Sequence, residues 1–130
     1  MKLETFLTIA AIIAIVFGLG FLVAPALMLT QYGIVASPGT TIMSRFFGAT
    51  LLNLGLVLFF ARRVNEAATR KGIVLGSLIG AVLGLLVAIH GQRVGVVNAL
   101  GWSSVAVYTF LLLGYAFFVF GKSVDGDVTR

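Results

Sequence analysis

Four long apolar runs dominate this 130-residue sequence and constrain its fold more than any other feature. The runs occupy residues 5–29, 41–61, 72–90 and 96–120. Each is close to, or longer than, the roughly 20 apolar residues that a helix needs to cross the hydrocarbon core of a bilayer. Strands are excluded because open sheet edges cannot be satisfied in lipid and the alternating polarity of a barrel is absent. We therefore expect one all-α integral membrane domain over 1–130, an antiparallel up-down-up-down bundle of four transmembrane helices with a flexible tail, 121–130.

The composition agrees with a membrane protein and excludes several other classes. Hydrophobic residues make up 60% of the chain and charged residues only 10%, too little polar surface to cover a soluble globule. The sequence contains no cysteine, which rules out disulfides and thiolate metal ligands. The net charge of +5 comes mostly from cations at the predicted helix ends, where they meet anionic lipid head groups. We therefore predict no nucleic-acid partner.

Lysine and arginine are divided unequally between the two predicted sides of the membrane. One side holds the termini and the 62–71 connection, with the cations Lys2, Arg62, Arg63, Arg70, Lys71, Lys122 and Arg130. The other side holds only Arg45 and Arg93. The positive-inside rule then predicts cytoplasmic termini, and we expect a bacterial inner membrane whose anionic lipids meet Arg62, Arg63, Arg70 and Lys71.

The first apolar run also has the outline of a secretory signal peptide. Lys2 precedes it, and Ala24, Pro25 and Ala26 resemble a small-residue cleavage site. Its apolar part is longer than the roughly 7–15 residues usual in a signal peptide, which favours a retained helix. Pro25 falls near the end of this helix, where a missing backbone donor matters least.

A glycine ladder in the third run is the sharpest candidate for a functional surface. Its members recur at intervals of four, at Gly72, Gly76, Gly80 and Gly84. Such a row lets another helix backbone approach closely. A similar row of small residues in the first run, Ala10, Ala14 and Gly18, is a natural partner inside the bundle. Packing within the chain, a subunit interface and a lipid or pigment groove are the three interpretations, in decreasing order of preference.

Three cationic or titratable side chains are candidates for binding an anion or a lipid. Arg45 is the only charge well inside an apolar run, and the topology places Arg93 and His90 on the same side of the membrane. They could converge on a phosphate or carboxylate. The alternative interpretation is structural. The Arg45 side chain would extend to the lipid head groups, and His90 would be a polar residue at a helix end rather than an axial ligand of a haem or chlorophyll.

Asn53 lies near the middle of the second run and should hydrogen-bond to another helix. The candidate partners are Ser77, Ser103, Ser104 and Thr109. Because an unpaired amide is costly in lipid, we interpret Asn53 as a structural residue rather than a substrate contact.

The acidic residues argue against catalysis, since no predicted span contains a carboxylate. A buried-acid proton exporter, a zinc or di-iron site and a Ser-His-Asp triad therefore all lack the residues that they need. We expect no metal and no cofactor.

Several residues carry a resemblance to known proteins. Pro25 closes the first helix, Arg45-Phe46-Phe47-Gly48-Ala49 opens the second, and Arg62 and Arg63 close it. In this layout the chain resembles small uncharacterised bacterial four-helix membrane proteins and, loosely, the DoxX-like group, from which no functional residues carry over.

Three functions follow from these features. The first is an interaction module or accessory subunit of a membrane complex that uses the glycine ladder, with self-association as one form. The second is a carrier or channel for a lipid-like or anionic molecule at Arg45, Arg93 and His90. The third and least favoured is an enzyme acting on a lipid or quinone.

Overall fold

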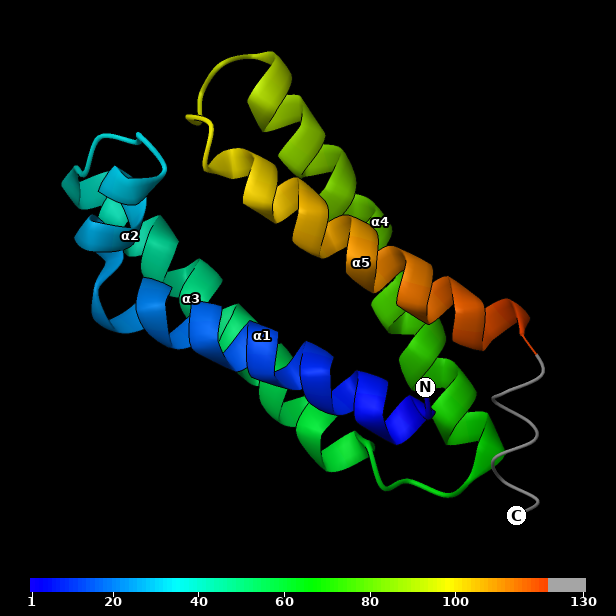
Figure 1. The fold of residues 1–130 in the computed structure, drawn as a ribbon. Coiled ribbons are helices and arrows are strands. Elements are labelled where there is room, and N and C mark those ends of the chain that lie inside the picture. The colour runs from blue at the N-terminus through cyan, green and yellow to red at the C-terminus, as the bar shows by residue number, and fades with distance from the viewer. Residues whose placement is uncertain (122–130) are drawn as a thin grey trace.

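The computed structural model describes residues 1–121, and this part of the chain is all-helical (Figure 1). The helices are α1 (Leu3–Val23), α2 (Pro25–Gln31), α3 (Pro38–Ala61), α4 (Ala67–Arg93) and α5 (Gly101–Phe120). Among the described residues, four helices are long and apolar enough to cross a membrane, namely α1, α3, α4 and α5. The flexible tail expected over 121–130 lies outside the described residues from position 122 onward.

The first apolar run forms two helices instead of the single helix expected over 5–29. α1 ends at Val23, Ala24 leaves the helical region with φ −125° and ψ 58°, and α2 begins at Pro25. Proline has no backbone donor and disfavours helical geometry in the residue before it, so the helix cannot continue through Ala24. The chain changes direction at this point, and the short α2 lies across the end of α1 (Figure 1).

The other helix boundaries also differ from the expected ones for local reasons. α3 begins at Pro38 because Ser37 and Thr40 form a capping box, in which each side chain bonds to the other's backbone N–H. α5 begins at Gly101 rather than at Val96. Residues 94–100 instead form a turn that includes Gly95 at φ 72°.

The helices pack as two antiparallel hairpins. In the first, α1 and α3 touch backbone to backbone: a Cβ atom on Gly48 would lie 2.7 Å from the Gly18 carbonyl oxygen, and one on Gly55 would lie 3.0 Å from the Ala11 carbonyl oxygen. In the second, the Tyr108 ring of α5 lies directly on Gly84 of α4. Close approach at glycines is the usual way for helices to pack in lipid.

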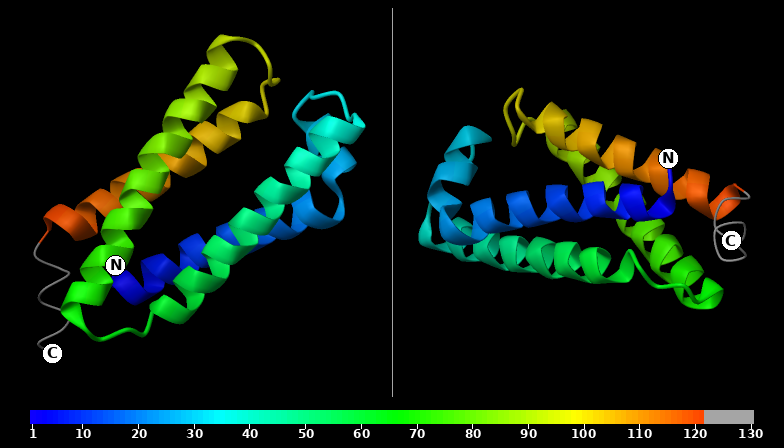
Figure 2. Two further views of the ribbon diagram at one scale, coloured as in Figure 1. Left: turned by 180° about the vertical axis from the view of Figure 1, so that it is seen from behind. Right: turned by 60° about the horizontal axis from the view of Figure 1, so that its bottom comes forward.

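The two hairpins meet near the start of α1 and again at the far turns (Figures 1 and 2). At the start of α1, Phe6 is 2% exposed and packs edge-on against Tyr115 of α5, with ring centroids 4.9 Å apart. At the far end, the Asn98 amide side chain donates to the Gln31 carbonyl at 2.9 Å, and the Asn98 backbone N–H donates to Tyr32 at 3.0 Å. Loops far apart in the sequence are thereby tied together.

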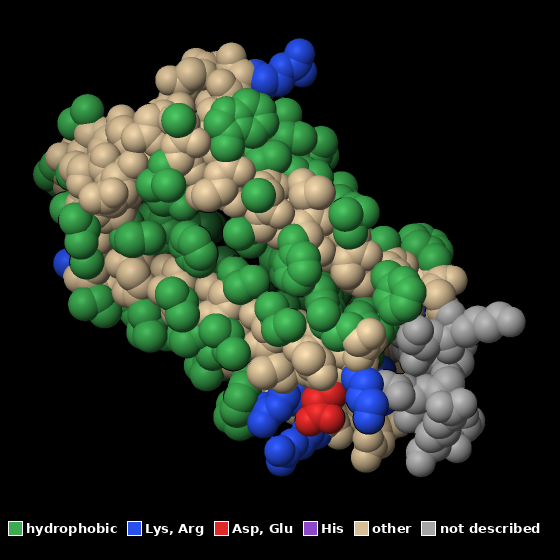
Figure 3. Space-filling view, in the orientation of Figure 1, with side chains coloured by type: hydrophobic (Ala, Val, Ile, Leu, Met, Phe, Trp, Pro, Cys, Tyr) green, Lys and Arg blue, Asp and Glu red, His purple; other side chains and the backbone are tan. Residues whose placement is uncertain are grey.

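The surface is apolar along the helices and charged at their ends. In the view of Figure 3, hydrophobic side chains cover the middle of the molecule, and the acidic and most of the basic side chains that are visible gather at one end. This distribution is the one expected when the middle of each long helix faces lipid.

Candidate functional site: an open glycine face and the Arg45 pocket

The structure divides the glycine ladder into two parts. Around Gly72, Gly76 and Gly80, no described atom lies within 4 Å of the position that a Cβ would take, the helix's own backbone aside. Gly84 differs, because the Tyr108 ring fills the space beside it. We name the first three residues the open glycine face.

The open glycine face points away from the rest of the chain. The residues that α4 buries inside the molecule include Val74 and Ala81, which are 0% and 5% exposed. At about 100° per residue, both lie on the opposite side of the helix from Gly76. Exposed apolar residues, including Ile79 and Leu83, lie beside the glycines.

The row of small residues in α1 is buried, but its main neighbour is α3. Ala10 and Ala14 are 2% and 7% exposed, and a Cβ on Gly18 would lie 2.7 Å from the Leu52 nitrogen of α3. α1 therefore does not cover the open glycine face of α4. Gly48 and Gly55 complete this contact from α3, and their spacing of seven residues was the signal in the sequence that could have identified them.

Asn53 lies on the outer side of α3. Gly48 and Gly55, which face α1, are about 140° and 200° away from it around the helix. Its side chain is exposed and has no hydrogen bond to any residue that the structure describes. Two of the expected partners bond locally instead: Ser103 donates to the Leu100 carbonyl at 2.6 Å, and Thr109 donates to the Val105 carbonyl at 2.8 Å.

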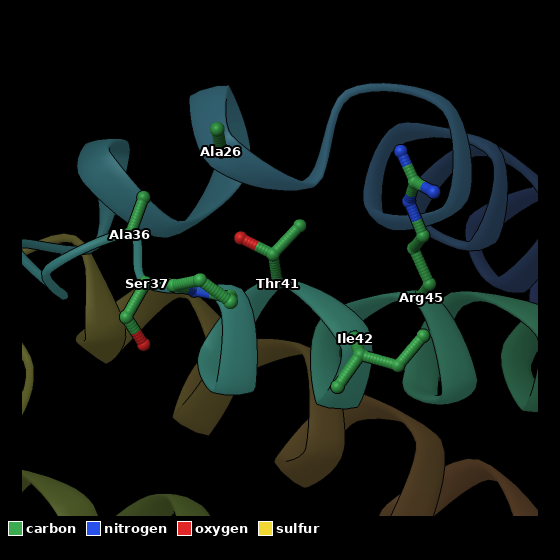
Figure 4. A pocket seen from close by; sticks show the side chains of 7 residues that line it. Ala26, Ala36, Ser37, Thr41, Ile42 and Arg45 are labelled. Atoms are coloured by element: carbon green, nitrogen blue, oxygen red, sulfur yellow. The ribbon is translucent and has the colours of Figure 1, made fainter.

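A shallow pocket lies between α2 and the first turns of α3 (Figure 4). Its lining consists of Ala26, Ala36, Ser37, Pro38, Thr41, Ile42 and Arg45. Thr41 and Arg45 are one helical turn apart on α3; the Thr41 side chain lies under α2, and the Arg45 side chain extends toward the connection that precedes α2 (Figure 4). Thr41 was not singled out from the sequence, although its i, i+4 spacing to Arg45 was a signal for it.

The three cationic candidates do not share this pocket. Arg93 and His90 are in the last turn of α4, are exposed and are not among the residues that line the pocket. Among the described residues that line the pocket, only Arg45 is charged.

The basic residues near the α3–α4 connection differ in environment. Arg62 stacks over the Phe59 ring at 3.6 Å and donates to the Phe59 carbonyl at 2.5 Å. Arg63 pairs with Glu4 at 3.8 Å and is exposed, as is Lys71. Arg70 is 8% exposed. Three of these four cations are therefore at least partly accessible to lipid head groups.

No group of three His, Cys, Asp or Glu side chains that could hold a metal ion occurs within residues 1–121. The two acids in this part of the chain, Glu4 and Glu66, lie in the first helix and before the fourth.

Comparison with known proteins finds no matching family model, no similar curated protein and no similar solved structure. A function must therefore be argued from the chain's own geometry.

Proposed function

We propose that the chain is an integral membrane interaction module whose open glycine face binds a helix of a second copy or of a larger membrane complex. The observation that supports this proposal is the empty space around Gly72, Gly76 and Gly80. By contrast, the helical glycines Gly18, Gly48, Gly55 and Gly84 each contact another helix of the same chain.

The physical argument starts from the cost of glycine in a helix. Each glycine weakens a helix by roughly 0.5–1 kcal/mol relative to alanine, and no contact within residues 1–121 offsets this at the open glycine face. The face extends over nine residues, from Gly72 to Gly80, or about 12 Å of helix. Lipid tails pack poorly against a row of bare backbone, whereas a second helix gains van der Waals contact and Cα–H···O bonds along it.

We also propose that α1, α3, α4 and α5 cross a bacterial inner membrane in an up-down-up-down arrangement with both termini in the cytoplasm. The excess of Lys and Arg at the α3–α4 connection and the termini supports this orientation. α2 then lies at the outer surface.

A carrier for an anionic molecule receives less support. That function needs Arg45, Arg93 and His90 near one another, and the Arg45 pocket includes neither of the other two.

The test is a double substitution, Gly76→Leu with Gly80→Leu, at two positions where a Cβ atom would have no described neighbour within 4 Å. We expect the intact protein in a mild detergent to lose its oligomer or its co-purifying partner in native mass spectrometry. Ala106→Leu is the matched control because Ala106 is also exposed, on α5, and it should leave the complex unchanged. A complex that survives the double substitution would refute the proposal.

A further inference from the structure

We propose that the Arg45 pocket binds a phosphate anion, presented either by a phospholipid head group or by free phosphate. This site is separate from the open glycine face, which is on α4. Arg45 supplies the charge, Thr41 supplies a hydroxyl donor, and Ala26, Ala36 and Ile42 form the apolar part of the wall (Figure 4).

Within residues 1–121, Arg45 has no counter-charge near it. Of the two acids within residues 1–121, Glu4 pairs with Arg63, and Glu66 immediately precedes α4, next to the connection from α3. Arg45 is about two turns from the start of α3, near the opposite end of that helix from the connection to α4. The described residues also offer its guanidinium no hydrogen-bond acceptor. Its five donors are thus available to an external anion.

Thr41 adds a second donor on the same side of α3. Its hydroxyl has no side-chain hydrogen bond to the described residues, in contrast with the neighbouring Thr40, which is fully engaged in the helix cap. Both side chains rise from the side of α3 that faces α2 and the connection before it, with the Thr41 oxygen toward Ala36 and the Arg45 guanidinium beside that connection (Figure 4). Rotation of Thr41 about χ1 would turn its hydroxyl toward Arg45, and a guanidinium fork with a hydroxyl matches the several acceptor oxygens of one phosphate group.

The position of the pocket favours an amphipathic ligand. Arg45 is seven residues from the first residue of α3, or roughly 10 Å along the helix axis, so its side chain reaches the depth at which head groups begin. The wall beside it is formed by small and branched apolar side chains. A phospholipid would place its phosphate on Arg45 and its glycerol and first acyl carbons against Ile42.

The experiment uses the full chain in a neutral detergent, with phosphatidylglycerol added, and counts bound lipid by native mass spectrometry. We expect one retained lipid for the unmodified protein. Arg45→Gln should lower the retained fraction roughly tenfold, the factor expected for loss of a charge-assisted hydrogen bond. Arg93→Gln is the control, because Arg93 is exposed outside the pocket, and it should retain the lipid.

Two further variants keep the test decisive if Arg45→Gln does not fold. Arg45→Lys keeps the charge but loses the planar fork, and Thr41→Val removes only the hydroxyl; each should give intermediate retention. Inorganic phosphate, followed by ³¹P NMR, separates the two sources: Arg45-dependent binding of phosphate without lipid retention identifies the free anion. Equal lipid retention and equal phosphate binding in all variants would overturn the proposal.

Discussion

At the scale of single residues, Asn53 is the least expected feature. It lies on the outer side of α3, among exposed apolar side chains that include Phe46, Val57 and Phe60. Transfer of an amide from water to a solvent that cannot hydrogen-bond costs about 4–8 kcal/mol. If α3 crosses the membrane, this side chain needs a partner, and the first 121 residues of the chain do not supply one.

We predict that Asn53→Leu weakens self-association or partner binding by roughly 0.6–2 kcal/mol, the range measured for interhelical hydrogen bonds in lipid. The free energy of unfolding of the monomer should not fall, because no bond within the described chain is lost. Fluorescence energy transfer at several protein-to-detergent ratios measures the association. Val57→Leu, on the same face, is the control. Unchanged association together with a less stable monomer would contradict this prediction.

At the scale of helices, tight packing is concentrated where glycines meet backbone. A Cβ on Gly48 would lie 2.6 Å from the Leu22 nitrogen and 2.7 Å from the Gly18 carbonyl oxygen, and backbone atoms cannot move aside as side chains can. Gly72 provides the contrast, since its surroundings are open. Both are helical glycines in apolar helices, so they form a matched pair for substitution.

We predict that Gly48→Ala lowers the free energy of unfolding by about 1–3 kcal/mol through overpacking of α1 against α3. Gly72→Ala should leave it unchanged or raise it by about 0.5–1 kcal/mol, because alanine is the better helix former. Unfolding in mixed micelles of increasing dodecyl sulfate content, followed by circular dichroism, measures both. Equal destabilisation by the two substitutions would mean that the open glycine face is packed within the chain.

At the level of the entire fold, the two hairpins are joined at one end by a cluster of buried side chains and at the other by hydrogen bonds between loops. Phe6 against Tyr115 forms one junction, and Asn98 with the end of α2 forms the other. The charged connection between α3 and α4 and the loop after α2 lie at opposite ends of α3. These two loops therefore report the orientation of the molecule in its membrane.

Single cysteines test this orientation on a background that contains none. We expect an impermeant maleimide to label Val35→Cys in intact cells, and Asn65→Cys only after the membrane is permeabilised, because positively charged loops remain in the cytoplasm. Both Val35 and Asn65 are exposed, and both lie outside the helices. The opposite pattern would contradict the orientation that we propose.

The helical class and the number of long apolar helices could be predicted from residues 5–120, because length and hydropathy are local properties. The break at Pro25 could be predicted only in part. The proline indicated that a helix ends nearby, but the formation of a second helix after it depended on how α2 packs against the rest of the chain. The turn before α5 was missed because Val96 and Val97 are apolar in sequence, yet Asn98 ties this segment to Gln31, which lies 67 positions earlier.

For the candidate surfaces, too, part could be predicted from the sequence and part depended on helix packing. Small-residue spacing along one helix predicts that another helix can approach it closely, because spacing and helix pitch are local properties of the sequence. The identity of the neighbour that makes this approach is not a local property, because it depends on how whole helices pack in the fold. Gly18 and Gly48 lie where α1 packs against α3, and Gly84 contacts the Tyr108 ring. Gly72, Gly76 and Gly80 have no such neighbour among the described residues. Likewise, the sequence placed Arg45 near a helix end, but only the fold separated it from Arg93 and His90 and set Thr41 beside it.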